Sequence, residues 1–247
     1  MKSPTSFPNP ELSGLRLPKG VPGPSLFYIF MRRFFQVTIS LGCKIRVYNR
    51  HFEPARGGAV YICNHQSFLD PVLMAFSLRR PMSFMARDTL FQVPLFKQVI
   101  TGLNAFPVRR GTADTGAMKE AMRRLKAGGQ VVIFAEGTRT LDGRIGRFLP
   151  GVVLLAQRSA EWIVPVVLDG AYEAWPRTQM LPSPGSSISV RYAQPIHRDE
   201  ARKMDAETFI NHVRDVLIEM QADVRRRTGR PKLEYDVVKS EILSTKS

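Results

Sequence analysis

A histidine stands five residues before an aspartate in the segment 64–70, directly after the apolar run 59–63. An imidazole oriented by a carboxylate is the usual means of removing a proton from a hydroxyl at neutral pH. Positions five apart lie about 140° from each other around a regular helix, so His65 and Asp70 can meet only across a turn or a helix start. We therefore predict that His65 lies in a loop and acts as a general base, with Asp70 as its partner.

Two helix starts satisfy this requirement. Either Ser67 is the N-cap and Asp70 is the acid of a capping box, or Asp70 is itself the N-cap with Pro71 at the first helical position. The apolar segment that follows, 71–78, suits a buried helix. The competing interpretation is a surface or capping pair, which is more common than catalysis for a lone His near an Asp.

Polar groups also follow two other expected strands. The segment 102–111 carries Arg109 and Arg110 into a loop before a helix, and the segment 134–140 carries Glu136, Gly137, Thr138 and Arg139. Carboxyl ends of strands form the ligand crevice of open α/β sheets, so these groups could converge with His65. Arginine forks beside a glycine turn suit a phosphate, although each segment alone also fits a solvated face or an ordinary turn.

The expected elements of the chain alternate between strands and helices. We expect strands over 44–48, 59–63, 82–86, 131–134, 163–168 and 187–192, and helices over 71–78, 112–127, 151–159 and 205–225. This alternation predicts one layered α/β domain over 44–225, with a mixed, largely parallel sheet flanked by helices. The strand over 187–192 is expected at an edge, and residues 226–247 are expected to form a loose polar tail.

The amino-terminal part has a different composition. Residues 1–23 are rich in proline and are predicted to be a disordered leader, whereas 24–43 predict an amphipathic helix. Its apolar stripe consists of Leu26, Phe30, Phe34, Val37 and Leu41, and its polar side of Arg32, Arg33, Gln36 and Ser40. Such a helix suits the plane of a membrane interface or, equally, packing on the domain's own core.

Composition limits the partners and the compartment. The 247 residues are 44% apolar and carry a net charge of +15, with a pI near 10.4, which calls for nucleic acid, an anionic membrane or phosphorylated substrates. Two cysteines are too few for a disulfide framework and indicate a reducing compartment. No apolar run reaches the roughly 18 residues of a spanning helix, and no signal peptide is evident. We therefore expect the protein to stay on the cytoplasmic side.

The order of the segments resembles a known family. The blocks His-x4-Asp, Phe-Pro-Val-Arg-Arg, Phe-Ala-Glu-Gly-Thr-Arg and Val-Pro-Val, within about 45–195, resemble the glycerolipid acyltransferase family of the bacterial 1-acylglycerol-3-phosphate acyltransferase type. The chain departs from the commonest family form at Arg109, where Asp is frequent, at Ala135, where Pro is frequent, and at Leu149-Pro150, where Lys often precedes Gly151. These departures affect, above all, which acceptor headgroup the resemblance predicts.

The resemblance implies transfer of a fatty acyl group from acyl-CoA or acyl carrier protein to the free hydroxyl of lysophosphatidate. By the same resemblance, His65 is the base, Asp70 orients it, and the acceptor site is lined by Arg109, Arg110, Glu136, Gly137, Thr138 and Arg139. Other acceptors, namely another lysophospholipid or a lyso-aminolipid, remain alternatives, as does a non-catalytic lipid-binding module. No cofactor is implied beyond the thioester co-substrate.

Further expectations concern the lipid and the metal. Phe91 and Phe96, in an apolar stretch over 90–100, could line an acyl-chain pocket or touch the bilayer, or simply pack in the core. No metal is expected, because His51, His197 and His212 lack metal-site spacing. The expected partners are an anionic membrane surface and a lysophospholipid, without nucleic acid, since no nucleic-acid-binding motif is present. We expect a peripheral or monotopic protein on the cytoplasmic face of the cell membrane.

Overall fold

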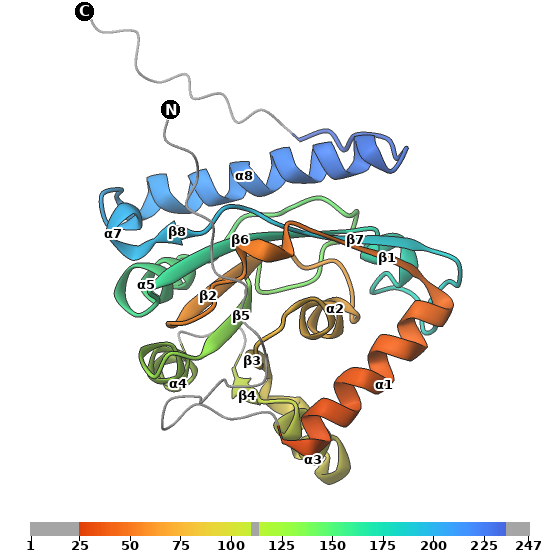
Figure 1. Cartoon of the computed structure of the whole chain (residues 1–247), viewed down its shortest axis with the longest axis horizontal. Helices are drawn as coiled ribbons and strands as arrows, with labels where there is room; N and C mark the ends of the chain where they lie inside the picture. Colours follow the sequence, from red (N-terminus) through yellow and green to blue (C-terminus); the bar gives the residue numbers. More distant parts are fainter. Residues whose placement is uncertain (1–24, 110–113, 236–247) are drawn as a thin grey trace, which may run out of the picture.

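One mixed sheet organises the protein. The computed structural model describes residues 25–109 and 114–235, and its strands lie in the order β1-β7-β6-β2-β5-β3-β4, with β8 paired to β6 (Figure 1). The strands are β1 Lys44–Tyr48, β2 Ala59–Cys63, β3 Met82–Arg87, β4 Ala105–Val108, β5 Gln130–Phe134, β6 Trp162–Asp169, β7 Ser187–Tyr192 and β8 Ile196–His197. Pairs that include β2 or β3 are parallel, and β6 pairs antiparallel with β7 and β8. The predicted fold class is confirmed.

Two strand predictions are wrong. β7 is not an edge strand, because β1 pairs with it in parallel and lies outside it. The segment 105–108, which we expected to be part of a loop, forms β4 at the opposite edge. An edge strand tolerates Pro107, because the missing N–H group has no partner strand to bond on the outer side.

Helices cover both faces of the sheet. They are α1 Leu26–Gly42, α2 Asp70–Ser77, α3 Pro94–Gly102, α4 Thr115–Lys126, α5 Gly151–Arg158, α6 Ala171–Ala174, α7 Arg198–Ala201 and α8 Ala206–Arg227, with 3-10 turns η2 Arg50–Phe52 and η3 Asp88–Gln92. Side chains alternate across β2: Val60 and Ile62 pack with α4, α5 and α8, whereas Tyr61 and Cys63 pack with α2. β2 is therefore buried on both faces, as the continuous apolar run 59–63 requires.

Helix α1 packs on the protein through a side that carries Tyr28, Arg32, Gln36 and Ile39. The buried Tyr28 and the side chains of Arg32 and Gln36 face α2, where Arg32 donates hydrogen bonds to the carbonyl oxygens of Leu78 and Arg79 and Gln36 donates to that of Phe76. The predicted apolar stripe is exposed along its whole length: Leu26, Phe30, Phe34, Val37 and Leu41. The interpretation in which this stripe packs on the domain core is therefore wrong. Within residues 25–109 and 114–235, no helix has the length and apolarity needed to cross a bilayer.

The start of the expected tail is bound to the fold. Arg230 forms an ion pair with the buried Asp169, at 3.0 Å, and the Tyr235 hydroxyl accepts a hydrogen bond from the backbone N–H of Ile145 and donates one to Gln221. Residues 226–235 are thus polar but not loose, which corrects that expectation. The predicted leader 1–23 and residues 236–247 lie outside the described residues.

Candidate active site

The His65 loop is attached directly to the carboxyl end of β2. The side chain of Asn64 pairs with the backbone of Leu168 on β6 through two hydrogen bonds of 2.8 Å, so the chain leaves the sheet in a fixed direction. The next residue places its Nδ1 atom 2.7 Å from Oδ2 of Asp70. The predicted meeting of His65 and Asp70 is confirmed, while their catalytic role stays a prediction.

The helix start differs in detail from both predicted forms. α2 begins at Asp70 with Leu69 in the N-cap position, and neither Ser67 nor Asp70 is the cap. The reason is that Asp70 Oδ2 accepts the backbone N–H groups of Gln66 (2.6 Å) and Ser67 (2.8 Å), which curls the preceding loop over the carboxylate. Pro71 does lie in the first turn, as one of the two forms required.

These contacts fix the position of the carboxylate and of the ring. The Asp70 side chain is fully buried at the amino-terminal end of α2 and accepts two backbone N–H groups. A carboxylate in this position takes the proton-bearing Nδ1 of a neutral imidazole and leaves Nε2 with the lone pair. The ring of His65 also stacks on Phe134, with centroids 4.3 Å apart, so its orientation is set on two sides.

Glu136 is a brace for the histidine loop. It follows β5, and its Oε1 and Oε2 atoms accept the backbone N–H groups of His65 (2.8 Å) and Gly146 (3.0 Å). Burial raises the pKa of Glu136 to about 7, although these two hydrogen bonds and the charge of Arg214 act in the opposite direction. Both oxygens are therefore already engaged, and the geometry gives Glu136 a positioning role that we did not predict.

Arg139 is also brought to the His65 loop. Its guanidinium carbon lies 3.5 Å from the ring centroid of Phe68, and Phe68 is two residues before Asp70. The turn that makes this possible needs Gly137, which has φ +70° and stands where an added Cβ would come within 2.5 Å of Leu149. Thr138 lies on the same turn and is exposed.

The other predicted arginines are placed differently. Arg109 follows β4 at the same edge of strand ends, but β5 and β3 separate β4 from β2, a spacing of about 14 Å at about 4.8 Å per strand. Its backbone N–H donates to Asp114, and the side chain is exposed. Arg110 lies outside the described residues. The structure thus joins Glu136 and Arg139 to His65 and leaves Arg109 farther away.

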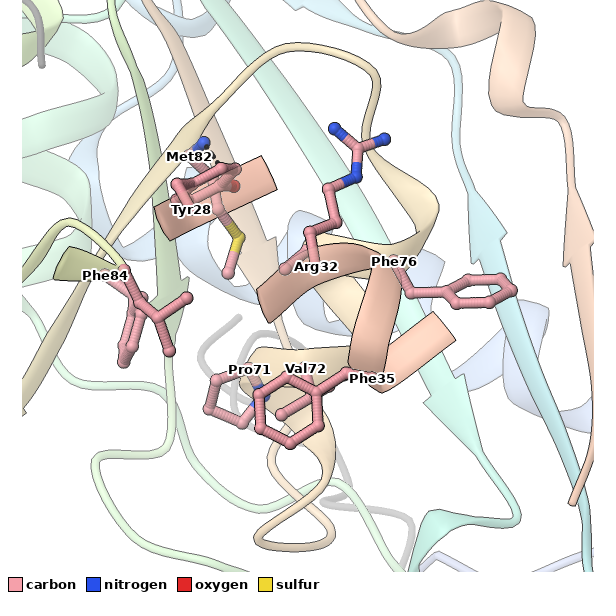
Figure 2. Close-up of a pocket in the computed structure, with 10 residues that line it drawn as sticks. Tyr28, Arg32, Phe35, Pro71, Val72, Phe76, Met82 and Phe84 are labelled. Atoms are coloured by element: carbon pink, nitrogen blue, oxygen red, sulfur yellow. Dashed lines mark hydrogen bonds between the residues drawn. The ribbon is translucent and has the colours of Figure 1, made fainter. Parts of the chain in front are cut away.

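An apolar cleft lies between α1, α2 and β3 (Figure 2). It is open to solvent, and its empty space of about 390 Å³ includes part of that solvent. Its lining is almost entirely apolar, from Tyr28, Arg32, Phe35, Pro71, Val72, Ala75, Phe76, Met82, Phe84 and Leu103. Pro71, the residue after Asp70, is therefore part of the lining.

The residues predicted for an acyl-chain pocket lie outside this cleft. Phe91 is half-buried and Phe96 is exposed, and their contact with an acyl chain stays a prediction. Core packing is wrong for most of the stretch 90–100, since Leu90, Val93 and Leu95 are exposed. The signal that could have found the cleft is the apolar pair 71–72 directly after Asp70, facing the alternating apolar residues of β3.

Comparisons with known proteins agree with this geometry. A family model described as "Acyltransferase" matches residues 44–169, beginning at the residue where we predicted the domain to begin. A 1-acyl-sn-glycerol-3-phosphate acyltransferase of Bacillus subtilis is 32% identical over 145 residues, which cover 58% of this chain and 71% of that protein. A chloroplastic enzyme of the same name from Arabidopsis thaliana is 28% identical over 193 residues, 74% of this chain, and the chain spans only 54% of its length.

A solved structure has the same fold. The crystal structure of the 1-acyl-sn-glycerophosphate (LPA) acyltransferase PlsC from Thermotoga maritima superposes with a TM-score of 0.69 over 80% of each chain, at 22% identity. This similarity supports the order of strands and helices described above. It does not by itself assign a substrate to the site.

Proposed function

Because the chain belongs to the acyltransferase family, we propose that it transfers a fatty acyl group from a thioester to the free hydroxyl of 1-acylglycerol 3-phosphate, giving phosphatidate. The observation that carries this proposal is the hydrogen bond of 2.7 Å between His65 and the buried Asp70. The names of the relatives from Bacillus subtilis and Arabidopsis thaliana support the acceptor.

The chemistry needs one base and no acyl-enzyme. Nε2 of neutral His65 removes the proton of the acceptor hydroxyl while its oxygen attacks the thioester carbonyl carbon. The imidazolium that forms is stabilised by Asp70, held at 2.7 Å. When the tetrahedral intermediate collapses, the new C–O bond remains, the C–S bond breaks and His65 returns the proton to the leaving thiolate.

Binding of the acceptor phosphate is assigned to the arginines around the site. Arg139 lies against Phe68 of the His65 loop. Arg109, which follows β4, completes the proposed acceptor site together with Arg110, Gly137 and Thr138. A guanidinium fork suits a phosphate because it presents paired N–H donors. The co-substrate is acyl-CoA or acyl carrier protein thioester, and no other cofactor is required.

The proposed reaction also needs a membrane contact and a site for the acyl chain. The exposed stripe of α1 suits the interface of an anionic bilayer, where each nearby Lys or Arg adds about 1 kcal/mol of attraction. The apolar cleft lies between this helix, α2 and β3 (Figure 2), and its lining includes Pro71, the residue after Asp70, so we propose it as a berth for a fatty acyl chain in addition to Phe91 and Phe96. We place the protein at the cytoplasmic face of the cell membrane as a peripheral or monotopic protein.

One assay tests the proposal. The purified protein is given labelled acyl-CoA or acyl carrier protein thioester with lysophosphatidate, other lysophospholipids, a lyso-aminolipid or glycerol 3-phosphate. Turnover with lysophosphatidate that is lost in His65→Ala and reduced in Asp70→Asn, both with unchanged thermal unfolding, is the expected result. Equal product from the wild type and both variants would refute the mechanism. Lysolipid binding without turnover would favour the non-catalytic lipid-binding alternative.

A further inference from the structure

The connection between α6 and β7, residues 175–185, exposes two large apolar side chains. Met180 is 92% exposed and Leu181 77% exposed, values comparable with Leu26 and Leu41 at the two ends of α1. The loop is nevertheless held in shape: the indole N–H of Trp175 donates to the carbonyl of Gln179 at 3.1 Å, and the Ser183 N–H donates to that of Ala174 at 2.7 Å. A structured loop that presents bulky apolar groups to water indicates an interaction surface.

The two ends of the loop are bound to the two functional parts already described. At its start, the carbonyl oxygen of Trp175 accepts the Ser67 hydroxyl at 2.8 Å, and its ring lies 5.5 Å from that of Phe68. At its end, the Gly185 N–H donates to the carbonyl of Gly42 at 2.7 Å, which is the last residue of α1. The loop therefore connects the His65 loop with the carboxy-terminal end of α1, which runs along one side of the molecule (Figure 1).

The charge of the segments around α1 and loop 175–185 is complementary to an anionic surface. Neither residues 25–52 nor residues 174–198 contain a single Asp or Glu. The exposed basic side chains are Arg177 in the loop and Lys44 and Arg46 in β1, which pairs with β7 directly after the loop. The Arg46 guanidinium donates to Ser187 there. Tryptophan, arginine and exposed apolar groups together are typical of the membrane interface.

We propose that loop 175–185 is a second lipid-contacting element, which inserts Met180 and Leu181 into the same anionic bilayer surface as α1. Two contacts at separate points fix the tilt of the protein on the membrane, whereas one helix leaves it free to rotate about its axis. The loop thereby holds the mouth of the His65 site against the surface that carries the lysolipid. This consequence for catalysis rests on the proposed function, but the lipid contact itself does not.

A spectroscopic experiment tests the contact directly. Leu181→Trp and, as a matched control, Leu154→Trp on α5 are each made in a Trp162→Phe background, which keeps Trp175 and its hydrogen bond to Gln179, and the emission of the Trp162→Phe protein itself is subtracted from both. Vesicles contain phosphatidylglycerol and phosphatidylcholine brominated on its acyl chains. On binding, the Leu181→Trp variant is expected to shift its emission to the blue and to be quenched, whereas the Leu154→Trp variant is not. Absence of shift and quenching at position 181 in vesicle-bound protein overturns the proposal.

An activity experiment separates this proposal from the function. The double variant Met180→Glu, Leu181→Glu is expected to weaken vesicle binding roughly tenfold or more, because it loses the two apolar side chains that the bilayer would bury. Turnover of vesicle-borne lysophosphatidate falls accordingly, but turnover of a short-chain, monomeric lysophosphatidate is retained, and Leu154→Glu changes neither. Unchanged vesicle binding, or loss of both turnovers with normal thermal unfolding, overturns the loop's role. If the wild type acylates no lysophospholipid, the proposed function fails while the tryptophan spectra still decide the lipid contact.

Discussion

Replacing Glu136 by Gln removes a carboxylate whose oxygens hold the backbone N–H groups of His65 and Gly146. Burial raises the pKa of this group from 4.5 to about 7, and the charge of Asp70 acts in the same direction, while Arg214 opposes it. A tenfold change in proton affinity is worth about 1.4 kcal/mol, so this shift corresponds to about 3 kcal/mol in the free energy of unfolding.

The sign of the effect follows from proton binding. Between pH 4.5 and about 7 the folded protein holds this proton and the unfolded chain does not, so the stability of the wild type falls as the pH rises through that window. The Glu136→Gln variant cannot ionise at this position. The difference in unfolding free energy, wild type minus variant, should therefore decrease by about 3 kcal/mol from about pH 4.5 to about pH 8.

Denaturant unfolding of both proteins across that range measures the difference, and other titrating groups largely cancel because both proteins share them. At higher pH, the amide of the variant can accept only one of the two N–H groups, which leaves one donor without its acceptor at a cost of about 1–3 kcal/mol. We expect kcat to fall more than the KM for the acceptor changes. A stability difference that is flat with pH would refute the assignment of a buried, proton-holding brace.

The remaining predictions concern the base, the membrane helix and the turn. His65→Ala should lower kcat by roughly 10² to 10⁴ with normal thermal unfolding, which a steady-state assay and a thermal melt check together; Asp70→Asn should lower it in the same direction, and a normal kcat would contradict the tautomer argument. Leu26→Glu with Phe30→Glu should release the protein from anionic vesicles in a flotation assay, and unchanged flotation would remove α1 from the membrane contact. Gly137→Ala should destabilise the fold by about 1 kcal/mol or more, measured by denaturant unfolding, because of its positive φ and the close approach of Leu149.

The sequence predicted most of the elements because burial alone sets their patterns. The run 59–63 is apolar at every position since β2 is central and covered on both faces, and the periodic apolar residues of α8 mark its buried side. Strand order is different, because it depends on partners far away in the chain. Nothing in residues 187–192 shows that β1 pairs outside them, so the expected edge was wrong.

The sequence predicted which residues belong to the site better than it predicted their contacts. The separation of His65 and Asp70 required a turn, and the structure supplies one, but through backbone N–H groups that every residue except proline possesses and that no sequence pattern displays. The same reason hides the bracing role of Glu136. For α1, the sequence shows an apolar stripe opposite arginines, whereas the choice of side follows from carbonyl groups at 78–79 that accept Arg32.

The outward apolar stripe of α1 also governs how the protein behaves without lipid. In aqueous buffer, exposed leucine and phenylalanine side chains lower their free energy by covering one another, so we expect molecules to associate through this helix. The apparent mass in solution should then rise with protein concentration and fall when a mild detergent is added. A sedimentation result obtained in plain buffer would thus report on helix masking and not on a biological assembly.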